Sequence, residues 1–170
     1  MLRAFQKPLR FRTAGGQAML RETLNQALKD AMKAKDARRL ATLRLILAAL
    51  KDRDIAARTS GDDRTGIPDD AILALLQTMV KQRRESITLY EQGGRTDLAT
   101  QEKEEIAVIE SFLPKQLSDA EIEAAAKAAI AEVGAQGIKD MGKAMAVLKA
   151  KYTGQMDSAK AAAILKGLLS

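Results

Sequence analysis

Apolar residues recur every three or four positions through almost the whole chain from Leu20 onward. That spacing places them on one face of an α-helix, so it predicts consecutive amphipathic helices rather than strands. The first four are expected at residues 20–35, 37–58, 68–92 and 96–112. Only 3% of the residues are aromatic and there is no Trp, so Leu, Ile, Ala, Val and Met must build the core. Because Ala and Leu lead the scale of helix propensity, this composition also favours an all-α fold.

The helical pattern is interrupted by the segment FLPKQLSDAEI. Pro114 disfavours a helical conformation at the residue before it, which predicts the end of the fourth helix. Ser118 and Glu121 have the spacing of a capping box, in which each side chain bonds the other residue's free backbone amide. Leu117 and Ile122 flank this box where a hydrophobic staple requires apolar residues. The segment therefore predicts a helix end followed by a well-defined helix start.

The chain after this break has smaller side chains and shorter predicted helices. Ala-rich segments with helical spacing cover residues 119–133, 140–151 and 157–169. We therefore expect two domains. The first is an antiparallel bundle of about four helices at residues 19–113, and the second is a small three-helix domain at residues 114–170.

Residues 1–18 differ from the rest of the chain. They contain four basic residues and no acidic residue, and they lack helical periodicity. Transit peptides share this charge pattern, although this segment has a single hydroxyl residue, Thr13. Alternatively, Met19 is the natural start and residues 1–18 are an upstream extension. In either case we expect the segment to be disordered or to lie outside the fold.

The chain has no Cys and no His. Disulfides, thiolate zinc sites and catalytic thiols are therefore excluded, and so are the commonest general base and the commonest transition-metal ligand. We expect no catalytic residue, no metal site and no cofactor in this chain. No apolar run approaches the roughly 18 residues of a membrane span. These features together predict a cytoplasmic protein with no membrane partner.

The net charge of +6 is distributed unevenly. Residues 19–113 are balanced, whereas residues 141–170 have a net charge of +4. The basic residues in this last stretch are Lys143, Lys149, Lys151, Lys160 and Lys166. Such a group would contact nucleic-acid phosphates with salt-dependent affinity and without reading sequence directly. Ala- and Lys-rich helices also commonly present a solvated lysine face, and spacing alone leaves both interpretations open.

Two further residues in this region are candidates for nucleic-acid contact. Tyr152 is the only aromatic residue there, so its ring could stack on a base or simply pack where a helix ends. Gly142 could allow a nucleic-acid backbone to approach closely, or it could be a helix-boundary residue, and the same holds for Gly154.

The other candidate group combines charges that border the apolar stripes of two helices. Glu102 and Glu105 lie four residues from apolar positions of the predicted fourth helix, and Arg83 continues the stripe of the third. We expect a partly buried ion pair of Arg83, or of Arg44, with one of these carboxylates. Two carboxylates could instead transfer protons. The structural interpretation is favoured, because nothing resembling a nucleophile or a metal shell accompanies them.

Several short stretches occur in an order that is typical of one family. They are Leu43-Arg44-Leu45-Ile46, Arg83-Arg84-Glu85-Ser86-Ile87, Gly94-Arg95-Thr96-Asp97-Leu98, Glu102 and Glu105, the segment FLPKQLS, Met141-Gly142-Lys143-Ala144-Met145, and Gly154 followed by Asp157. Over about residues 20–170 the chain resembles the GatB/YqeY family.

This resemblance implies a helical bundle joined to a small C-terminal helical domain. The C-terminal part of YqeY-like proteins is related to the tail of the GatB subunit of glutamine-dependent aminoacyl-tRNA amidotransferase. The resemblance therefore implies contact with tRNA and association with a carbon–nitrogen ligase that uses glutamine as amido-nitrogen donor. The sequence departs from the family at Ala146, where a second glycine is frequent, and at Gln155, where an arginine is common. Loss of that arginine removes an expected phosphate contact.

Three functions follow as alternatives. The C-terminal domain is a binding module for tRNA or another translation component, or the chain is a subunit of an aminoacyl-tRNA amidotransferase whose other subunits hold the chemistry. The third alternative is a helical protein–protein adaptor with no nucleic-acid role.

Overall fold

The computed structural model describes residues 19–61 and 66–170. All regular secondary structure in this part of the chain is helical, as predicted. The α-helices are α1 (Met19–Ala34), α2 (Ala37–Thr59), α3 (Asp69–Gln92), α4 (Thr96–Glu110), α5 (Asp119–Val133), α6 (Met141–Lys151) and α7 (Ser158–Leu169), with a 3₁₀ turn, η1 (Ile138–Asp140), before α6. The predictions made for residues 1–18, and for residues 62–65 of the expected loop after α2, lie outside the described residues.

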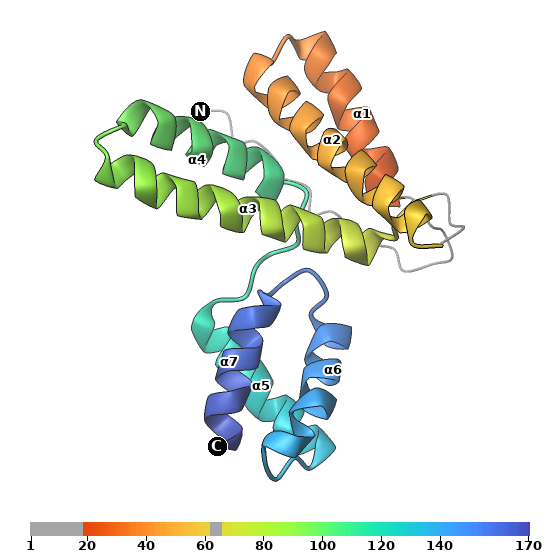
Figure 1. Cartoon of the computed structure of the whole chain (residues 1–170), viewed down its shortest axis with the longest axis vertical. Helices are drawn as coiled ribbons and strands as arrows, with labels where there is room; N and C mark the ends of the chain where they lie inside the picture. The colour runs from red at the N-terminus through yellow and green to blue at the C-terminus, as the bar shows by residue number, and fades with distance from the viewer. Residues whose placement is uncertain (1–18, 62–65) are drawn as a thin grey trace, which may run out of the picture.

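The first four helices pair as two hairpins. In Figure 1, α1 and α2 form one antiparallel hairpin, α3 and α4 form the other, and the two hairpins run at an angle to each other. Large side chains from all four helices share one core, whose most deeply buried members are Leu24, Leu43, Ile46, Leu50, Ile72, Leu76 and Ile109. Ala31 of α1 is buried in this core, whereas its neighbour Met32 is 54% exposed.

Two aspartate side chains accept hydrogen bonds from backbone amides at the starts of α2 and α1. Asp36 caps α2 by accepting a hydrogen bond from the backbone amide of Arg39 (3.1 Å). Asp69, the first residue of α3, accepts a hydrogen bond from the backbone amide of Leu20 (3.3 Å) and so ties the start of α1 to that of α3. These side chains satisfy amides that have no partner within their own helix.

The first half of α3 is buried on more than one side. Ile72 and Leu76 lie one turn apart on one side of the helix, and Leu73 and Val80 on a neighbouring side are also buried. A helix that is apolar nearly all round is expected to be enclosed by neighbours. Here the neighbours are α1, α2 and α4, together with the loop between α6 and α7, where Gly154 lies against the Leu73 side chain.

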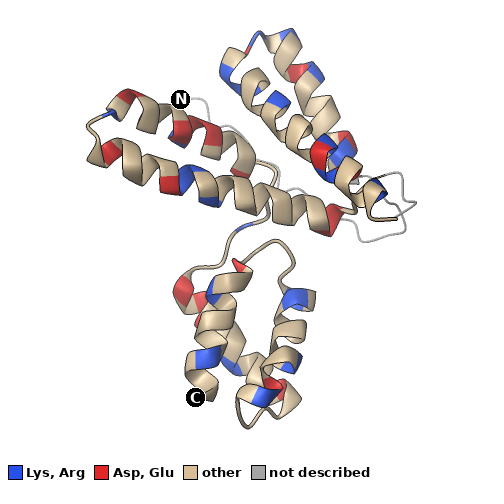
Figure 2. Cartoon of the chain, viewed as in Figure 1, with Lys and Arg blue, Asp and Glu red and all other residues tan. Residues whose placement is uncertain are grey.

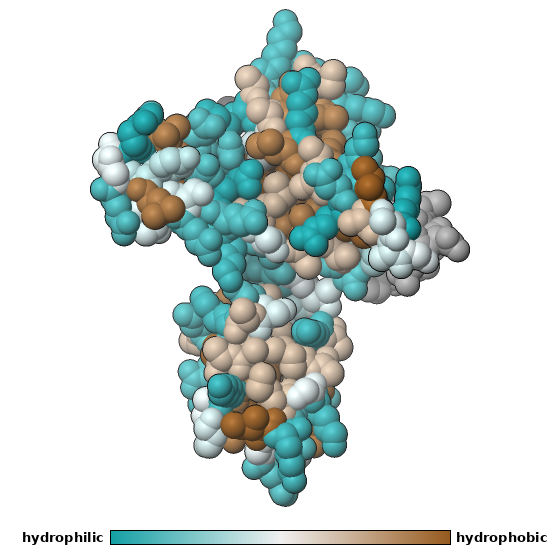
Figure 3. All heavy atoms as spheres, viewed as in Figure 1, coloured by the Kyte–Doolittle hydropathy of each residue, from teal (hydrophilic) through white to brown (hydrophobic). Residues whose placement is uncertain are grey.

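The last three helices pack against one another around a second cluster of buried residues. Three large side chains, Ile122, Leu148 and Leu165, are joined there mainly by alanines, namely Ala125, Ala126, Ala129, Ala144 and Ala161. In Figure 3 the surface of these helices is broadly pale brown, in keeping with the many exposed alanines of α5, α6 and α7.

The predicted capping box is present at the start of α5. Ser118 Oγ accepts a hydrogen bond from the Glu121 amide (3.2 Å), and the Ser118 amide donates to Glu121 Oε2 (3.4 Å). Leu117 packs against the cluster that contains Ile122, as a hydrophobic staple requires. Asp157 caps α7 in the same way, with its carboxylate accepting from the Ala159 amide (2.8 Å).

Candidate functional site

The five lysines predicted to contact phosphates are all exposed, three on α6 and two on α7. Two of them are neutralised by carboxylates of α5. Lys151 is paired with Glu132, and Lys160 lies 2.8 Å from Asp119. The other three, Lys143, Lys149 and Lys166, form no ion pair within residues 19–61 and 66–170. The structure therefore divides the predicted group into compensated and uncompensated charges.

The lysines of α6 do not share one side of the helix. Successive residues of an α-helix are about 100° apart around its axis. Lys149 therefore lies about 120° from Lys143 in one direction, and Lys151 lies about 80° from Lys143 in the other. Figure 2 accordingly shows basic residues at several separate places on the C-terminal helices. The ammonium groups without carboxylate partners can reach phosphates from both flanks of α6 but do not form a single flat face.

Tyr152 and Gly142 occupy positions at the two ends of α6. Tyr152 is half-buried and packs against the core of the C-terminal helices, so most of its ring surface is already in contact with protein. Gly142 lies in the first turn and is exposed, and a Cβ added there would meet no atom within 4 Å. Nothing in the described chain approaches Gly142 closely enough to require glycine.

Arg83 lies beside both carboxylates that were predicted to join it. Its Nε is 3.0 Å from Glu105 Oε2 and 3.9 Å from Glu102 Oε2. The group is mostly buried between α3 and α4, with the Arg83 side chain 14% and the Glu105 side chain 10% exposed. Gln101 adds a weak hydrogen bond to Glu105 (3.4 Å), and Arg83 also donates to the Met79 carbonyl (3.2 Å). This network joins the two helices of the second hairpin.

The two carboxylates of this network are not equivalent. Burial raises the pKa of Glu102 above its ordinary value, the nearby charge of Glu105 raises it further, and Arg83 acts in the opposite direction. Arg44, the other predicted partner, does not take part. It lies on the exposed side of α2 and forms no ion pair with any residue that the structure describes.

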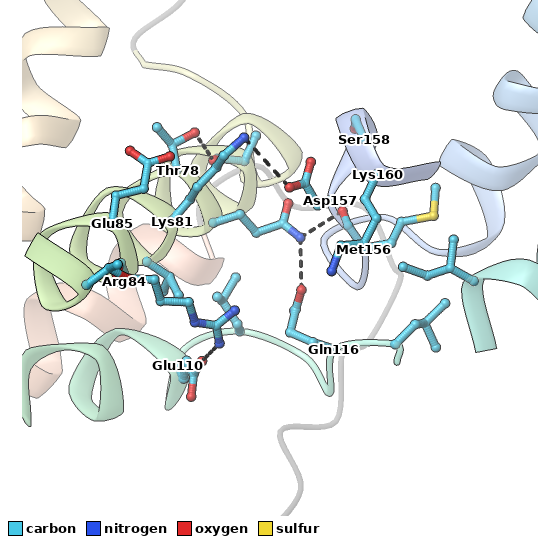
Figure 4. A pocket seen from close by; sticks show the side chains of 17 residues that line it. Thr78, Lys81, Arg84, Glu85, Glu110, Gln116, Met156, Asp157, Ser158 and Lys160 are labelled. Atoms are coloured by element: carbon cyan, nitrogen blue, oxygen red, sulfur yellow. Dashed lines mark hydrogen bonds and ion pairs between the residues drawn. The ribbon is translucent and has the colours of Figure 1, made fainter. Parts of the chain in front are cut away.

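A cleft of about 520 Å³ lies where α3 meets the C-terminal helices. Sequence patterns did not predict it, because its walls come from α3, the end of α4, the following segment and the start of α7. Figure 4 shows two ion pairs among its charged side chains. Lys81 is 3.9 Å from Asp157 and Arg84 is 2.8 Å from Glu110. Because these cations already face carboxylates, the cleft has little attraction left for an anionic ligand.

A pair of glutamines joins the two sides of this cleft. Gln77 Nε2 on α3 donates to Gln116 Oε1 and to the Met156 carbonyl, both at 3.0 Å. Gln116 Nε2 in turn donates to the carbonyls of Pro114 (2.9 Å) and Gly154 (2.7 Å). The interruption between α4 and α5 thus holds the α6–α7 loop against α3. A glutamine has no distinctive spacing signal, so sequence reasoning missed this contact.

The described residues contain no group of three or more acidic, His or Cys side chains placed to hold a metal ion. The polar groups of the cleft are amides, hydroxyls, paired charges and the carboxylate of Glu85. No helix in the described ranges is long and apolar enough to span a bilayer.

Comparisons with known proteins identify similar mitochondrial proteins in yeasts. The chain is 36% identical over 90 residues to "Altered inheritance of mitochondria protein 41, mitochondrial" of Eremothecium gossypii. This match covers 53% of this chain and 46% of that protein. It is 33% identical over 117 residues to the protein of the same name from Lachancea thermotolerans, covering 66% and 60%. The Candida glabrata protein is 34% identical over 91 residues, covering 54% and 48%.

These relatives correct one prediction. The chain was expected to be cytoplasmic, whereas each of these similar proteins is named as mitochondrial, which contradicts that expectation. The prediction relied on the absence of cysteines and of an apolar span, and neither feature distinguishes the cytosol from the inside of an organelle. The matches span about half the length of these curated relatives.

A family model adds the broadest match. The model described as "Yqey-like protein" matches residues 21–169, which includes the second core cluster, all of the first except Leu20, and the segment between them. This agrees with the family indicated by the short motifs of the sequence. The chain therefore belongs to the YqeY-like protein family.

Proposed function

We propose that this chain is an RNA-binding protein without a catalytic centre of its own, that tRNA is its RNA, and that residues 114–170 act as a separate binding module. The proposal rests on one electrostatic observation about that module. All six of its carboxylates have a partner, either a basic side chain or a backbone amide, whereas five of its eight basic residues have no carboxylate partner within the described chain. The five are Lys115, Lys139, Lys143, Lys149 and Lys166.

Uncompensated, exposed ammonium groups suit a polyanion. Binding phosphates releases counterions from nucleic acid, and this gives a salt-dependent affinity without base recognition. Lysine is a point charge on a flexible stem, so lysines on separate flanks of α6 can adapt to a curved phosphate backbone. The proposed activity is accordingly to hold an RNA rather than to read its sequence.

The chemistry performed on the RNA would belong to another protein. The resemblance to the GatB tail suggests a glutamine-dependent aminoacyl-tRNA amidotransferase as the class of partner. The chain has no Cys thiol to attack glutamine and no His to act as a general base. Transamidation should therefore appear only when partner subunits are supplied, and activity from the isolated chain would contradict the proposal.

A protein–protein adaptor is the second candidate, and one observation favours it. A groove of about 370 Å³ lies between α2 and α3 and is lined partly by Leu45, Ala49, Leu75 and Met79. The side chain of Leu45 is 47% exposed. The rest of the groove's lining is polar or charged, and an apolar patch with a polar rim often marks a contact site for another protein. Recovery of a protein partner after nuclease treatment, with loss of that partner in Leu45→Ser, would favour this role.

The chain provides a matched test of the RNA proposal. Filter binding of bulk tRNA to the full chain is measured between about 50 and 200 mM salt. K143Q/K149Q removes two uncompensated charges, and we expect the slope of log affinity against log salt to fall by about 1 to 2. K151Q/K160Q removes the same net charge from compensated pairs and should have a much smaller effect. Equal effects of the two double variants would contradict a specific role for the uncompensated lysines.

A further inference from the structure

The balanced charge of residues 19–113 conceals a strong polarity between the two hairpins. Residues 19–59, which form α1 and α2, have ten basic and five acidic residues, a net charge of +5. Residues 69–110, which form α3 and α4, have five basic and nine acidic residues, a net charge of −4. In Figure 2, basic residues predominate on α1 and α2, and acidic residues predominate on α3 and α4.

Most of the basic residues on the first hairpin are not neutralised. Arg21 is paired with Asp54, and Arg38 is paired with Glu104 of α4. Arg39 lies over the Phe112 ring at 5.4 Å. The remaining seven are exposed and form no ion pair with a described residue: Lys29, Lys33, Lys35, Arg44, Lys51, Arg53 and Arg58. The charge of Arg58 helps to lower the pKa of Asp54, although the two side chains form no ion pair.

Three of the seven form a straight line along α2. Arg44, Lys51 and Arg58 are spaced by seven residues, so successive members lie about 10 Å apart along the axis and only about 20° apart around it. The line therefore extends about 21 Å on one side of the helix. The opposite side of α2 is buried in the core through Leu43, Ile46 and Leu50.

The side chains between these cations are small or apolar. Ala41 and Ala48 are exposed and lie on the same side of α2, as does Ile55, whose side chain is 50% exposed. Asp52 lies about 80° to 120° around the axis from the three cations. Asp54 is nearer, about 60° from Lys51 and about 40° from Arg58, but its carboxylate accepts two hydrogen bonds from Arg21. Alanines do not project beyond the cations, so an extended anionic chain can approach the helix axis closely.

We infer that this line, Arg44–Lys51–Arg58, is a second RNA-binding surface that contacts the phosphate backbone. The inference rests on the proposed function for the identity of the polyanion, but it uses a different part of the molecule. A linear arrangement of cations suits a chain of phosphates better than a compact anion, and two of the three are arginines, which bind phosphate through paired N–H donors. The acidic second hairpin repels RNA and so directs it to this side.

Other polyanionic partners fit the surface less well. Lying in a membrane interface requires an apolar helix face that is free to enter the lipid, and the apolar face of α2 is packed in the core. An acidic protein would normally bring apolar contacts as well, and this line offers only Ile55 between the charges. These alternatives become outcomes of the test.

Three variants of the full chain test the inference with tRNA as the probe. R44Q/K51Q/R58Q removes the line, and glutamine keeps the helix propensity close to that of Arg and Lys. R84Q/R95Q/K103Q removes the same net charge from the acidic hairpin, where each cation is paired with a carboxylate. K143Q/K149Q reports on the C-terminal lysines. Circular dichroism confirms that each variant is folded.

For R44Q/K51Q/R58Q we expect a loss of about 10- to 100-fold in tRNA affinity and a decrease of about 2 to 3 in the salt slope. The variant on the acidic hairpin should remain within about twofold of the natural chain, because paired surface charges contribute little. If both triple variants lose affinity equally, the inference is wrong. It is also wrong if vesicles containing phosphatidylserine bind more tightly than tRNA and depend on the same line.

The two proposals fail in different ways. If the natural chain does not bind tRNA at any salt concentration, the proposed function fails and the inference fails with it. If K143Q/K149Q weakens tRNA binding but R44Q/K51Q/R58Q does not, only the second surface is refuted. If the reverse holds, α2 is the RNA-binding surface and the C-terminal lysines are ordinary solvated residues.

Discussion

The two core clusters of this protein are built from different side chains. The cluster of α1–α4 consists almost entirely of Leu, Ile, Val, Met and Phe, whereas the cluster of α5–α7 contains five buried alanines. Large side chains stabilise through the apolar area that they bury, while alanines contribute little area and allow helices to pack closely. The N-terminal cluster should therefore be sensitive to cavities and the C-terminal cluster to added volume.

Removing a large side chain from the first cluster is the most damaging change that we expect. Leu76 on α3 is completely buried, so Leu76→Ala leaves a cavity and should lower the free energy of unfolding by about 2 to 5 kcal/mol. Urea unfolding followed by circular dichroism measures this. Leu89→Ala on the same helix is the control, since Leu89 is 68% exposed and its truncation should change little. Similar losses for both variants would show that helix propensity, not packing, is being measured.

Adding volume to the second cluster should have the next largest effect. Ala126 on α5 is fully buried among other alanines, so Ala126→Leu forces the helices apart and should cost about 1 to 3 kcal/mol. Ala124 is exposed on the same helix, and Ala124→Leu adds the same atoms without crowding. Tolerance of Leu at position 126, measured by the same urea unfolding, would indicate that the cluster contains enough free space to repack.

The ion pairs of the two regions differ in burial as well. Arg21 and Asp54 join α1 to α2 through two hydrogen bonds of 2.7 and 3.0 Å, and the Asp54 side chain is 13% exposed. Asp54 also accepts from the Ile67 amide (2.9 Å). The hydrogen bonds from Arg21 are the main cause of a pKa below the ordinary value for this carboxyl, with a smaller contribution from the Ile67 amide. In the C-terminal region, Lys151 and Glu132 are both about half exposed.

Asp54→Asn should therefore cost about 1 to 2 kcal/mol at neutral pH, whereas Glu132→Gln should leave the stability unchanged within error. The pH dependence follows from the sign of the shift. A carboxyl whose pKa is lower in the folded state stabilises above its unfolded pKa of about 3.9, and this contribution is lost as the pH falls through the lower folded pKa. The difference between the natural chain and Asp54→Asn should shrink below about pH 4. A difference that grows on acidification would contradict this assignment.

Local signals in the sequence predicted much of the fold. Ser118, Glu121 and Asp157 bond to amides within three residues of themselves, and such caps can be recognised without knowledge of tertiary structure. Arg83 was placed beside Glu102 and Glu105 because all three border apolar stripes. Arg44 was named as the other possible partner of these carboxylates, but it does not contact them. Helical geometry places Arg44 opposite the buried Ile46 on α2, so the sequence pattern could have indicated its exposure.

Contacts between distant segments could not be predicted in the same way. Gln77 and Gln116 are 39 residues apart and neither belongs to a motif with a spacing rule. One signal was available, since the first half of α3 is apolar on several sides and therefore needs more neighbours than a single bundle provides. The charge polarity of the two hairpins was also present in the sequence, but it disappears when charge is summed over the whole bundle.

The smallest expected effect concerns the contact between the two regions. Gly154 in the α6–α7 loop has a φ of 73°, and a Cβ there would lie 2.8 Å from Leu73 Cδ1 of α3. Gly94 has nearly the same φ, 71°, but a Cβ there would meet no atom within 4 Å. Alanine in the left-handed conformation costs about 1 to 2 kcal/mol at either position.

We expect Gly154→Ala to lower the free energy of unfolding by about 1 kcal/mol more than Gly94→Ala does. This additional loss measures the contact of the loop with Leu73. Urea unfolding of both variants gives this difference directly. If the two glycines prove equivalent, the Leu73 side chain moves aside without cost, and the close approach of the loop to α3 does not hold the C-terminal helices in place. If Gly154→Ala costs more and Leu73→Ala abolishes the excess, the packing of this loop against Leu73 contributes to the coupling of the two regions.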